Sequence, residues 1–257
     1  MKKILFILFL LIALAGAGLL MFKLGNKTPL QIPSLSPTPA VKGVSTLSFE
    51  GEEYSFATVK VTDASRLKLL PNFSEQKTSE EIMNEGRCKS LVNGGFYSEK
   101  FSPIGLFISE REEIQKRQIN ATFNGFFLIS EGNIPEILKE TRDEEYRIAL
   151  QAGPILIMDS TPLKLSLKAE EQEKDRRVMV ALNDKGEIFF IVVFTQNSVF
   201  SGPTLASLPE VLKEIQNSLG ENFVSALNLD GGAASTFWGE GVKLKELSPI
   251  GSYFCIN

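Results

Sequence analysis

The chain has 257 residues, of which 43% are apolar, 23% charged and 9% aromatic, and it contains two cysteines and no histidine. This composition is typical of a globular protein, and the length suits one large domain or two small ones. The absence of histidine excludes Ser-His-Asp and Cys-His mechanisms and every zinc site with imidazole ligands. An enzyme with this sequence must take its acid-base chemistry from carboxylates, Lys, Tyr or Cys.

The net charge of −4 combines two regions of opposite charge. Of the 27 basic and 31 acidic side chains, five lysines and no acid lie in residues 1–43, which leaves 22 basic against 31 acidic side chains in residues 44–257. The acidic region repels nucleic acid over most of its surface, so we expect no nucleic-acid partner. An anionic substrate must be bound locally, by an arginine or by backbone amides.

An uncharged and almost entirely apolar run of nineteen residues, 4–22, follows Lys2 and Lys3. A helix of this length rises about 28 Å, roughly the hydrocarbon thickness of a bilayer. We expect residues 1–23 to be a signal anchor or a cleaved signal peptide, and the length of the run favours the anchor. Both place the C-terminal domain outside the cytoplasm, either on a single-pass cell-membrane protein held by residues 4–22 or on a secreted one.

Residues 24–43 contain four prolines among Ser, Thr and Gly and have no hydrophobic periodicity. This composition predicts a semi-extended linker, followed by the exported domain at residues 44–257. The two cysteines, Cys88 and Cys255, lie 167 positions apart. Export allows a disulfide between them, but isolated cysteines at such a separation are more often independent small core residues.

Alternation of apolar and polar residues over 46–61, with a turn at Glu50 and Gly51, predicts a β-hairpin. Further strands are expected at 91–92, 104–109, 122–129, 155–158, 178–182, 188–194, 224–229 and 250–256.

Two helices are predicted from their N-terminal signals. Thr78 with Glu81, and Ser207 with Glu210, have the spacing of capping boxes. After the second box apolar residues recur at helical spacing until Gly220 ends the segment. Because strands predominate, the sequence predicts an α+β domain with a mixed, largely antiparallel sheet and a few helices.

The most informative segment is 228–236, where an apolar strand ends in Asp230 and is followed by two glycines and two alanines. Small residues let backbone N–H groups approach a ligand and form an anion-binding concavity. An Asp-Gly turn in a hairpin is the alternative. Similar junctions occur beside apolar strands at 93–97, 103–105 and 151–154. Four such junctions are typical of one pocket built from several loops.

These segments resemble the phosphodiester glycosidase family, over about residues 75–256. Residues 93–97 resemble its Asn-Gly-Gly-aromatic segment, and 103–105 its Pro-x-Gly. Residues 151–154 resemble its Gln-(Ala/Ser)-Gly-Pro segment, and 228–236 its Leu-Asp-Gly-Gly-Gly-Ser-Ser-Thr loop.

Arg177 stands where the family's arginine opens a strand, although its run of charge, EEQEKDRR, otherwise predicts a solvated loop. A surface salt bridge is the alternative for this arginine. Ala233 and Ala234 replace a family Gly and Ser, and Val178 and Met179 stand where Ser or Thr and Ala are usual. Prokaryotic proteins that resemble this one are mostly exported, and many are described as exopolysaccharide-related.

The resemblance implies hydrolysis of the bond between a sugar C1 and a phosphodiester oxygen. A phosphate leaves more easily than an alkoxide, so strong acid assistance is less necessary than in an ordinary glycosidase. The reaction needs a carboxylate, for which Asp230 is the candidate, and positive charge on the phosphate, for which Arg177 is the candidate. The expected substrate-binding residues are Asn93, Gly94, Gly95, Gly153, Gly231, Gly232, Ser235 and Thr236.

We expect a glycan or sugar-phosphate substrate and no cofactor. A non-catalytic glycan-binding or exopolysaccharide-assembly module with the same pocket remains an alternative, because two alanines interrupt the 228–236 loop. A phosphodiesterase with an oxygen-ligated Ca or Mg ion is a third possibility, for which the sequence has no spaced carboxylate motif.

Overall fold

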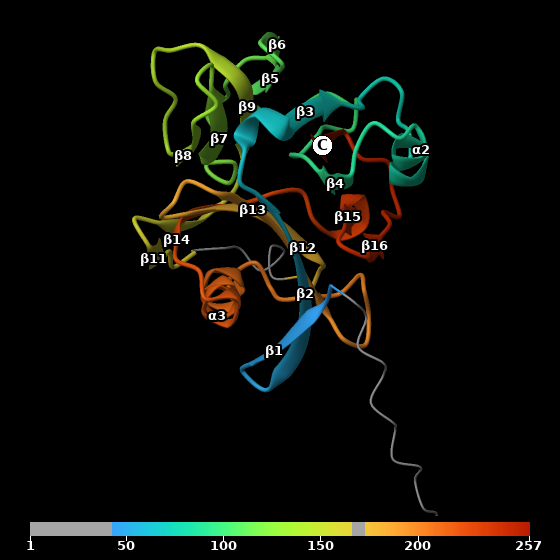
Figure 1. Cartoon of the computed structure of the whole chain (residues 1–257), viewed down its shortest axis with the longest axis vertical. Coiled ribbons are helices and arrows are strands. Elements are labelled where there is room, and N and C mark those ends of the chain that lie inside the picture. Colours follow the sequence, from blue (N-terminus) through green and yellow to red (C-terminus); the bar gives the residue numbers. More distant parts are fainter. Residues whose placement is uncertain (1–42, 166–172) are drawn as a thin grey trace, which may run out of the picture. The chain divides into compact units, whose positions relative to one another are not determined.

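The computed structural model describes residues 43–165 and 173–257, whose strands form three antiparallel sheets (Figure 1). The largest has seven strands in the order β1-β2-β13-β12-β14-β10-β11. They are β1 (Ser45–Phe49), β2 (Glu52–Val61), β13 (Ile188–Thr195), β12 (Arg177–Asn183), β14 (Phe223–Asn228), β10 (Ile155–Met158) and β11 (Thr161–Pro162). Apolar runs in β12 and β13 are buried along almost their whole length, so both faces of this sheet are covered.

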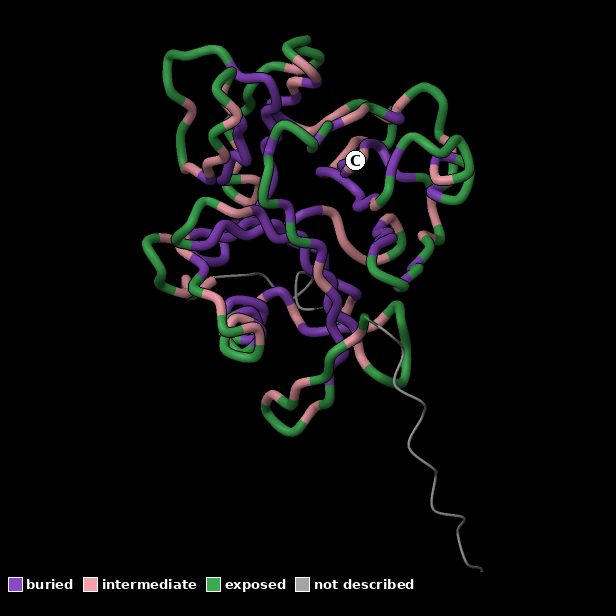
Figure 2. The backbone as a smooth tube through the Cα atoms, in the orientation of Figure 1, coloured by how far each residue is buried: buried purple, intermediate pink, exposed green. Residues whose placement is uncertain are grey.

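Helix α3 (Leu208–Leu219) covers one face of the seven-stranded sheet, and the other two sheets cover the opposite face (Figure 1). The apolar side of α3, with Leu212 and Ile215, packs on Met179 and Ile191 of the central strands. Buried residues are concentrated along this sheet in Figure 2. Burial of each such side chain contributes roughly 1.5–3 kcal/mol.

The second sheet has the order β16-β15-β4-β17-β3. Its strands are β16 (Val242–Leu244), β15 (Phe237–Gly239), β4 (Ser90–Asn93), β17 (Ser252–Ile256) and β3 (Leu67–Pro71). The short helix α2 (Ser79–Asn84) packs on this sheet through Ile82, which contacts a small cluster with Leu91 and Trp238. β4 leads directly into the first predicted glycine junction.

The third sheet has the order β6-β5-β9-β7-β8. Its strands are β6 (Glu112–Gln115), β5 (Phe107–Ser109), β9 (Tyr146–Ala152), β7 (Gly125–Ser130) and β8 (Pro135–Leu138). The three sheets share one core, in which Phe127, Phe190 and Phe254 come from different sheets. Their ring centroids are 4.7 to 6.5 Å apart, so these side chains join the sheets.

Most of the predicted elements are confirmed. The hairpin forms, with Glu50 and Gly51 at φ 51° and 81°, the positive values that a tight two-residue turn requires. Both hydrogen bonds of the first capping box are present, between Thr78 and Glu81. Helix α3 also forms and ends at Gly220 in the left-handed conformation.

Two predictions are corrected. Ser207 lies at the N-terminus of α3 but is itself helical and makes no side-chain cap, because its Oγ donates to Thr204 O at 3.1 Å. The sheets are not mixed, since every strand pair in the described residues is antiparallel. Seven strands of the described ranges were not predicted, namely β3, β6, β8, β9, β11, β15 and β16. Among them β9 is central to the third sheet and wholly buried.

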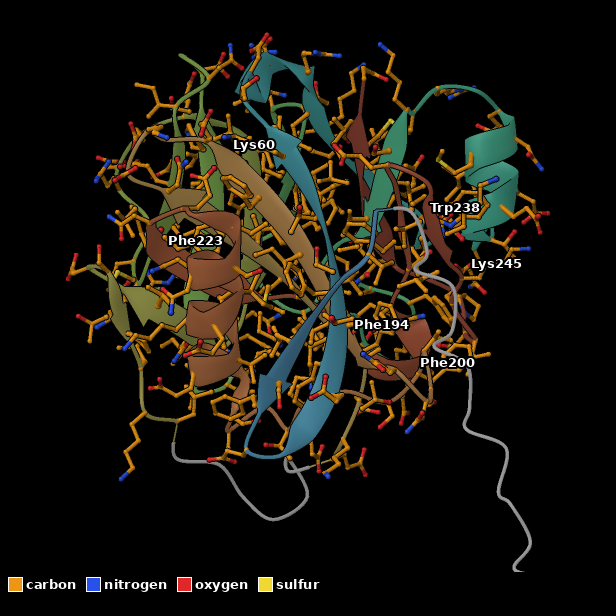
Figure 3. The ribbon with its side chains drawn as sticks, turned by 60° about the horizontal axis from the view of Figure 1, so that its bottom comes forward. Lys60, Phe194, Phe200, Phe223, Trp238 and Lys245 are labelled. Atoms are coloured by element: carbon orange, nitrogen blue, oxygen red, sulfur yellow. A yellow bond between two sulfur atoms is a disulfide. The ribbon has the colours of Figure 1, made fainter. Side chains whose placement is uncertain are left out.

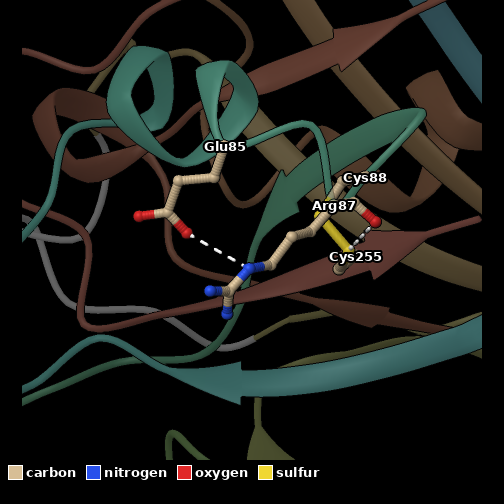
Figure 4. Close-up of a disulfide and its surroundings, with 4 residues drawn as sticks. All are labelled: Glu85, Arg87, Cys88 and Cys255. Atoms are coloured by element: carbon tan, nitrogen blue, oxygen red, sulfur yellow. Dashed lines mark hydrogen bonds and ion pairs between the residues drawn. A yellow bond between two sulfur atoms is a disulfide. The ribbon is translucent and has the colours of Figure 1, made fainter.

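Cys88 and Cys255 form a disulfide, with Cα atoms 5.2 Å apart, so the expectation of two independent cysteines is wrong (Figure 4). The pairing follows from the second sheet, where β17 lies beside β4 and Cys255 is opposite Leu91. Cys88 lies just before β4 and comes within the usual Cα distance of bridged cysteines. The separation of the two residues in sequence carries no information about this strand pairing.

The predicted signal segment 1–23 and the linker up to residue 42 lie outside the described residues. Within the described ranges, no helix is long and apolar enough to cross a membrane.

Candidate active site

The glycine junctions predicted from the sequence meet around the ends of β4, β12 and β14. The end of β14 and the start of β12 lie at the same edge of their sheet, because the strands are antiparallel neighbours. The N–H of Leu229 donates to Val178 O at 2.9 Å, which continues the pairing and brings Asp230 opposite Arg177. Asp230 N donates to Gly94 O at 3.3 Å, just beyond β4. Strand ends from two sheets therefore meet at one place.

The two other junctions lie against the same place. Gly153 and Asn228 exchange two hydrogen bonds, from Gly153 N to Asn228 O at 3.1 Å and from Asn228 Nδ2 to Gly153 O at 2.9 Å. The Pro-x-Gly segment is bonded to the first junction, because Ile104 N donates to Phe96 O at 3.0 Å. The structure thus brings all four segments together.

Asp230 is half-buried at the centre of these junctions. Burial raises the pKa of its carboxyl group to about 7, and a hydrogen bond from the N–H of Gly231 counteracts that rise only in part. Burial raises the pKa of Tyr97, and the negative charge of Asp230 raises it further. The Tyr97 hydroxyl donates to Pro249 O at 2.5 Å. A carboxyl group with a pKa near neutrality is suited to take up and release protons.

Arg177 is buried at the start of β12, although its ion-pair partner, Asp175, belongs to the same charged run. Its Nε donates to Pro203 O at 3.1 Å and its Nη2 to Glu173 O at 2.5 Å, while its Nη2 lies 3.9 Å from Asp175 Oδ2. Burial lowers the pKa of Arg177, and the nearby acids counteract this. A Cβ atom added at Gly231 would lie 3.9 Å from Nη1, so the guanidinium lies beside the loop that follows Asp230.

Asp175 places a second carboxylate at the site. Its Oδ1 lies 3.5 Å from the position that a Cβ atom would take at Gly232, two residues after Asp230. Its side chain is 35% exposed and forms the ion pair with Arg177. The sequence assigned this acid to a solvated loop, and no local pattern distinguishes it from the other acids of the charged run.

Arg176 was also assigned to the solvated run, but its side chain is completely buried. Its guanidinium donates to Ser235 Oγ at 2.7 Å, to Lys245 O at 2.8 Å and to Val199 O at 3.2 Å, and it lies 5.1 Å from the ring centroid of Phe200 (Phe200 and Lys245 are labelled in Figure 3). Burial lowers the pKa of Arg176 to about 10. Arg176 therefore holds the 228–236 loop from the inside.

Three predicted substrate-binding residues, Asn93, Ser235 and Thr236, lie in the interior. Thr236 Oγ1 donates to Leu244 O at 2.9 Å, and Ser235 Oγ donates to Gly232 O at 2.6 Å. The Asn93 amide bonds main-chain groups on both sides of the loop that carries Asp230. The polar atoms of these residues bond other groups of the protein, and these bonds hold the 228–236 loop from its buried side.

The main effect of the predicted glycines is to let neighbouring parts of the chain pack closely. Most of their N–H groups are already bonded within the protein. The N–H groups of Gly94, Gly153 and Gly232 all donate to main-chain oxygens. A Cβ atom at Gly94 would lie 2.3 Å from Ser252 Oγ, and Gly232 has φ 58°, which favours glycine. Within the described part of the chain, the N–H of Gly95 donates to no main-chain oxygen, but Gly95 is itself buried.

In the ranges that the structure describes, no group of three or more His, Cys, Asp or Glu side chains is placed to hold a metal ion. Two buried polar atoms beside the site, Asn228 Oδ1 and Ser252 Oγ, have no hydrogen-bond partner among these residues. Both retain the capacity to bond a ligand or solvent.

The fold and the clustered junctions agree with the family comparison. The family model for phosphodiester glycosidase matches residues 86–254, and the chain belongs to the phosphodiester glycosidase family. The resemblance read from the four sequence segments is therefore confirmed.

A solved structure with the same fold is the catalytic domain of zebrafish N-acetylglucosamine-1-phosphodiester alpha-N-acetylglucosaminidase, auto-inhibited by its pro-peptide. It matches with a TM-score of 0.63 and 16% identity over 83% of this chain and 81% of that one. A hypothetical protein from Synechocystis matches with a TM-score of 0.55 and 15% identity, over 82% of this chain and 61% of that one.

A curated relative is the uncharacterized protein YigE of Escherichia coli K12, which is 25% identical over 123 residues, or 44% of this chain. The match covers 47% of that relative, so the chain spans about half of its length.

Proposed function

We propose that the chain is an exported hydrolase that cleaves the glycosidic bond of a sugar-1-phosphodiester in an envelope or extracellular glycan. The observation that carries this proposal is the position of Asp230, whose carboxyl pKa is raised to about 7, opposite the buried Arg177. The Asp230 carboxyl group can accept and donate a proton near neutral pH. The Arg177 guanidinium supplies positive charge where little water screens it, so its electrostatic stabilisation of the leaving phosphate is strong.

In the proposed reaction ionised Asp230 either accepts a proton from water as the water attacks C1, or attacks C1 itself. In the second case water then cleaves the bond between C1 and the Asp230 carboxylate, which restores the free enzyme. The bond from C1 to the phosphate oxygen breaks, and the electron pair leaves with the phosphate. Arg177 Nη1 binds this phosphate, because it makes no hydrogen bond within the described residues and lies beside the loop that follows Asp230. No cofactor is required, and Asp175 keeps the guanidinium in place.

Export and membrane tethering through residues 4–22 are part of the proposal. The Cys88–Cys255 disulfide supports export, since disulfides persist mainly in oxidising compartments outside the cytosol. The acidic composition of residues 44–257 supports a neutral or locally bound substrate in preference to a polyanion.

The test is to incubate the full chain with a sugar-1-phosphodiester and to measure the reducing sugar that is released. Asp230→Asn is expected to lower kcat at least about 100-fold, the usual effect of removing a general base. Asp143→Asn is the matched control, because Asp143 is exposed and lies outside the site. Equal rates for Asp230→Asn and the control would remove Asp230 from the mechanism.

The buried positions of Asn93, Ser235 and Thr236 favour a second candidate, a glycan-binding module without turnover, since few side chains reach the substrate. This candidate predicts saturable binding of the same phosphodiester in a titration calorimeter with no release of reducing sugar.

A further inference from the structure

A cleft of about 470 Å³ opens beside the candidate active site, between the segment after β3, the 101–103 loop and β6. Its volume is within the range of small-molecule sites, about 300–1,000 Å³. Two phenylalanines, Phe73 and Phe101, provide its aromatic surface.

Tyr97 connects this cleft to the loop that carries Asp230, because it lies three residues after Gly94, whose carbonyl accepts the N–H of Asp230 at 3.3 Å. The rings of Tyr97 and Phe101 are stacked, with centroids 5.2 Å apart and an interplanar angle of 25°. Phe73 and Tyr97 both lie against Gly251, since a Cβ atom there would be 2.8 and 2.7 Å from their rings. One wall of the cleft therefore continues into the residues that surround Asp230.

Phe101 has φ 52°, a left-handed conformation that is strained for a bulky residue. Its conformation is held by a hydrogen bond from Phe101 N to Ser98 O at 2.9 Å, and Ser98 N donates to Ser102 O at 2.8 Å. The short loop fixes the ring of Phe101 between Tyr97 and the cleft, which is a rigid arrangement of the kind found at binding sites.

The lining of the cleft suits a neutral, hydroxyl-rich ligand. Aromatic and proline surfaces lie beside the exposed polar residues Ser74, Glu75 and Ser102. No lysine or arginine lines the cleft within the described residues, and the acid in its lining, Glu75, is paired with Lys77 at 2.7 Å, so the lining suits a neutral ligand better than a phosphate. A pyranose ring combines C–H groups that pack on an aromatic face with hydroxyls that bond polar side chains.

We propose that this cleft binds a neutral sugar unit of the glycan substrate, adjacent to the sugar phosphodiester that is held at Asp230. The inference rests on the proposed function for the identity of the substrate, whereas sugar binding in the cleft is measurable without any hydrolysis. The chain then acts on an extended glycan in preference to a free sugar-1-phosphodiester.

The experiment compares Ile114→Trp, which fills the cleft from its exposed lining, with Ile119→Trp. Ile119 is fully exposed on the same segment and does not line the cleft, so it is a matched control. Neutral trisaccharides of glucose, mannose and N-acetylglucosamine, all without phosphate, are titrated separately into the full chain. We expect at least one to bind saturably, with a Kd at least tenfold higher in Ile114→Trp and unchanged in Ile119→Trp.

Phe101→Ala is a second variant that weakens binding by removing aromatic surface instead of adding bulk. The proposal is overturned if none of the trisaccharides binds, or if both cleft variants bind as tightly as the unmodified chain. Sugar release from a short phosphodiester, measured in parallel, separates the two proposals. Release without trisaccharide binding contradicts the cleft alone, and trisaccharide binding without release contradicts the hydrolase alone.

Discussion

The Asn93 side chain bonds both ends of the loop that carries Asp230. Its Nδ2 donates to Asp230 O at 2.7 Å, and its Oδ1 accepts the N–H of Thr236 at 2.9 Å. Asn93 lies at the end of β4 and Asp230 just beyond β14, so one amide fixes the relative position of two sheets at the site. This interior role differs from the contact with substrate that the motif predicted.

Asn93→Ala is expected to lower the free energy of unfolding by about 1–3 kcal/mol, because it leaves a buried carbonyl and a buried N–H without partners. Urea denaturation measures this effect. Asn197→Ala is the control, since Asn197 is exposed, and it is expected to change stability by less than about 0.5 kcal/mol. Equal effects of the two substitutions would contradict the bridging role.

The raised pKa of Asp230 predicts a pH-dependent stability. Between the ordinary pKa of an aspartate, near 4, and the folded value of about 7, the native state binds more protons than the unfolded state. The stability associated with this group is therefore present at low pH and lost as the pH rises through 7. Asp230→Asn removes the buried charge, so it is expected to raise Tm at pH 8 by at least about 3 °C and to change it little at pH 4.

Differential scanning calorimetry of Asp230→Asn and Asp143→Asn at both pH values checks this prediction. A Tm increase of the same size for both variants, or a larger increase at pH 4 than at pH 8, would contradict it.

The two adjacent arginines are expected to respond differently to lysine. Arg176→Lys loses hydrogen bonds that one ammonium group cannot replace, and should lower stability by about 2–4 kcal/mol. Arg177→Lys should keep the charge but lose the planar fork, and so lower kcat/KM for a sugar phosphodiester at least about tenfold. Urea denaturation and the reducing-sugar assay, applied to both variants, show whether the losses separate in this way.

The disulfide is expected to stabilise the second sheet. Replacing both Cys88 and Cys255 with alanine should lower the free energy of unfolding by about 2–5 kcal/mol. Reductant should lower the Tm of the unmodified chain to that of the double variant and leave the double variant unchanged. A reductant effect of equal size in both proteins would show that the loss does not come from this bond.

The short-range signals in the sequence were sufficient for much of the fold. The hairpin, both helices and the strands β4 and β14, which end in glycine junctions, follow from alternation, caps and small residues, which are local properties. Strand β9 was missed by the sequence analysis, because Arg147 and Gln151 interrupt its apolar pattern although both side chains are buried. Arg147 donates to Leu67 O at 2.9 Å and Ala64 O at 2.8 Å, about 80 residues earlier in the chain.

The candidate site was predictable as a set of segments, but the direction of its side chains was not. Arg177 is the first residue of β12 and Arg176 directly precedes the strand, and the two side chains have different partners although they are neighbours in one charged run. Ser235 and Thr236 were expected at the surface of the loop, but the loop turns their hydroxyls inward. Such directions depend on strand register and on contacts between distant parts of the chain.

The dependence of the site on three sheets has a consequence for how the protein matures. Asn93 and Asp230 are 137 positions apart, and the loop of Asp230 also needs Gly153 and Arg176 in place. Contacts between residues so far apart in sequence form slowly, because the entropy of the long intervening loop is lost before the contact contributes any stability. The site is therefore assembled only after β17 has been synthesised and the three sheets have docked, so any activity of the site will report complete folding.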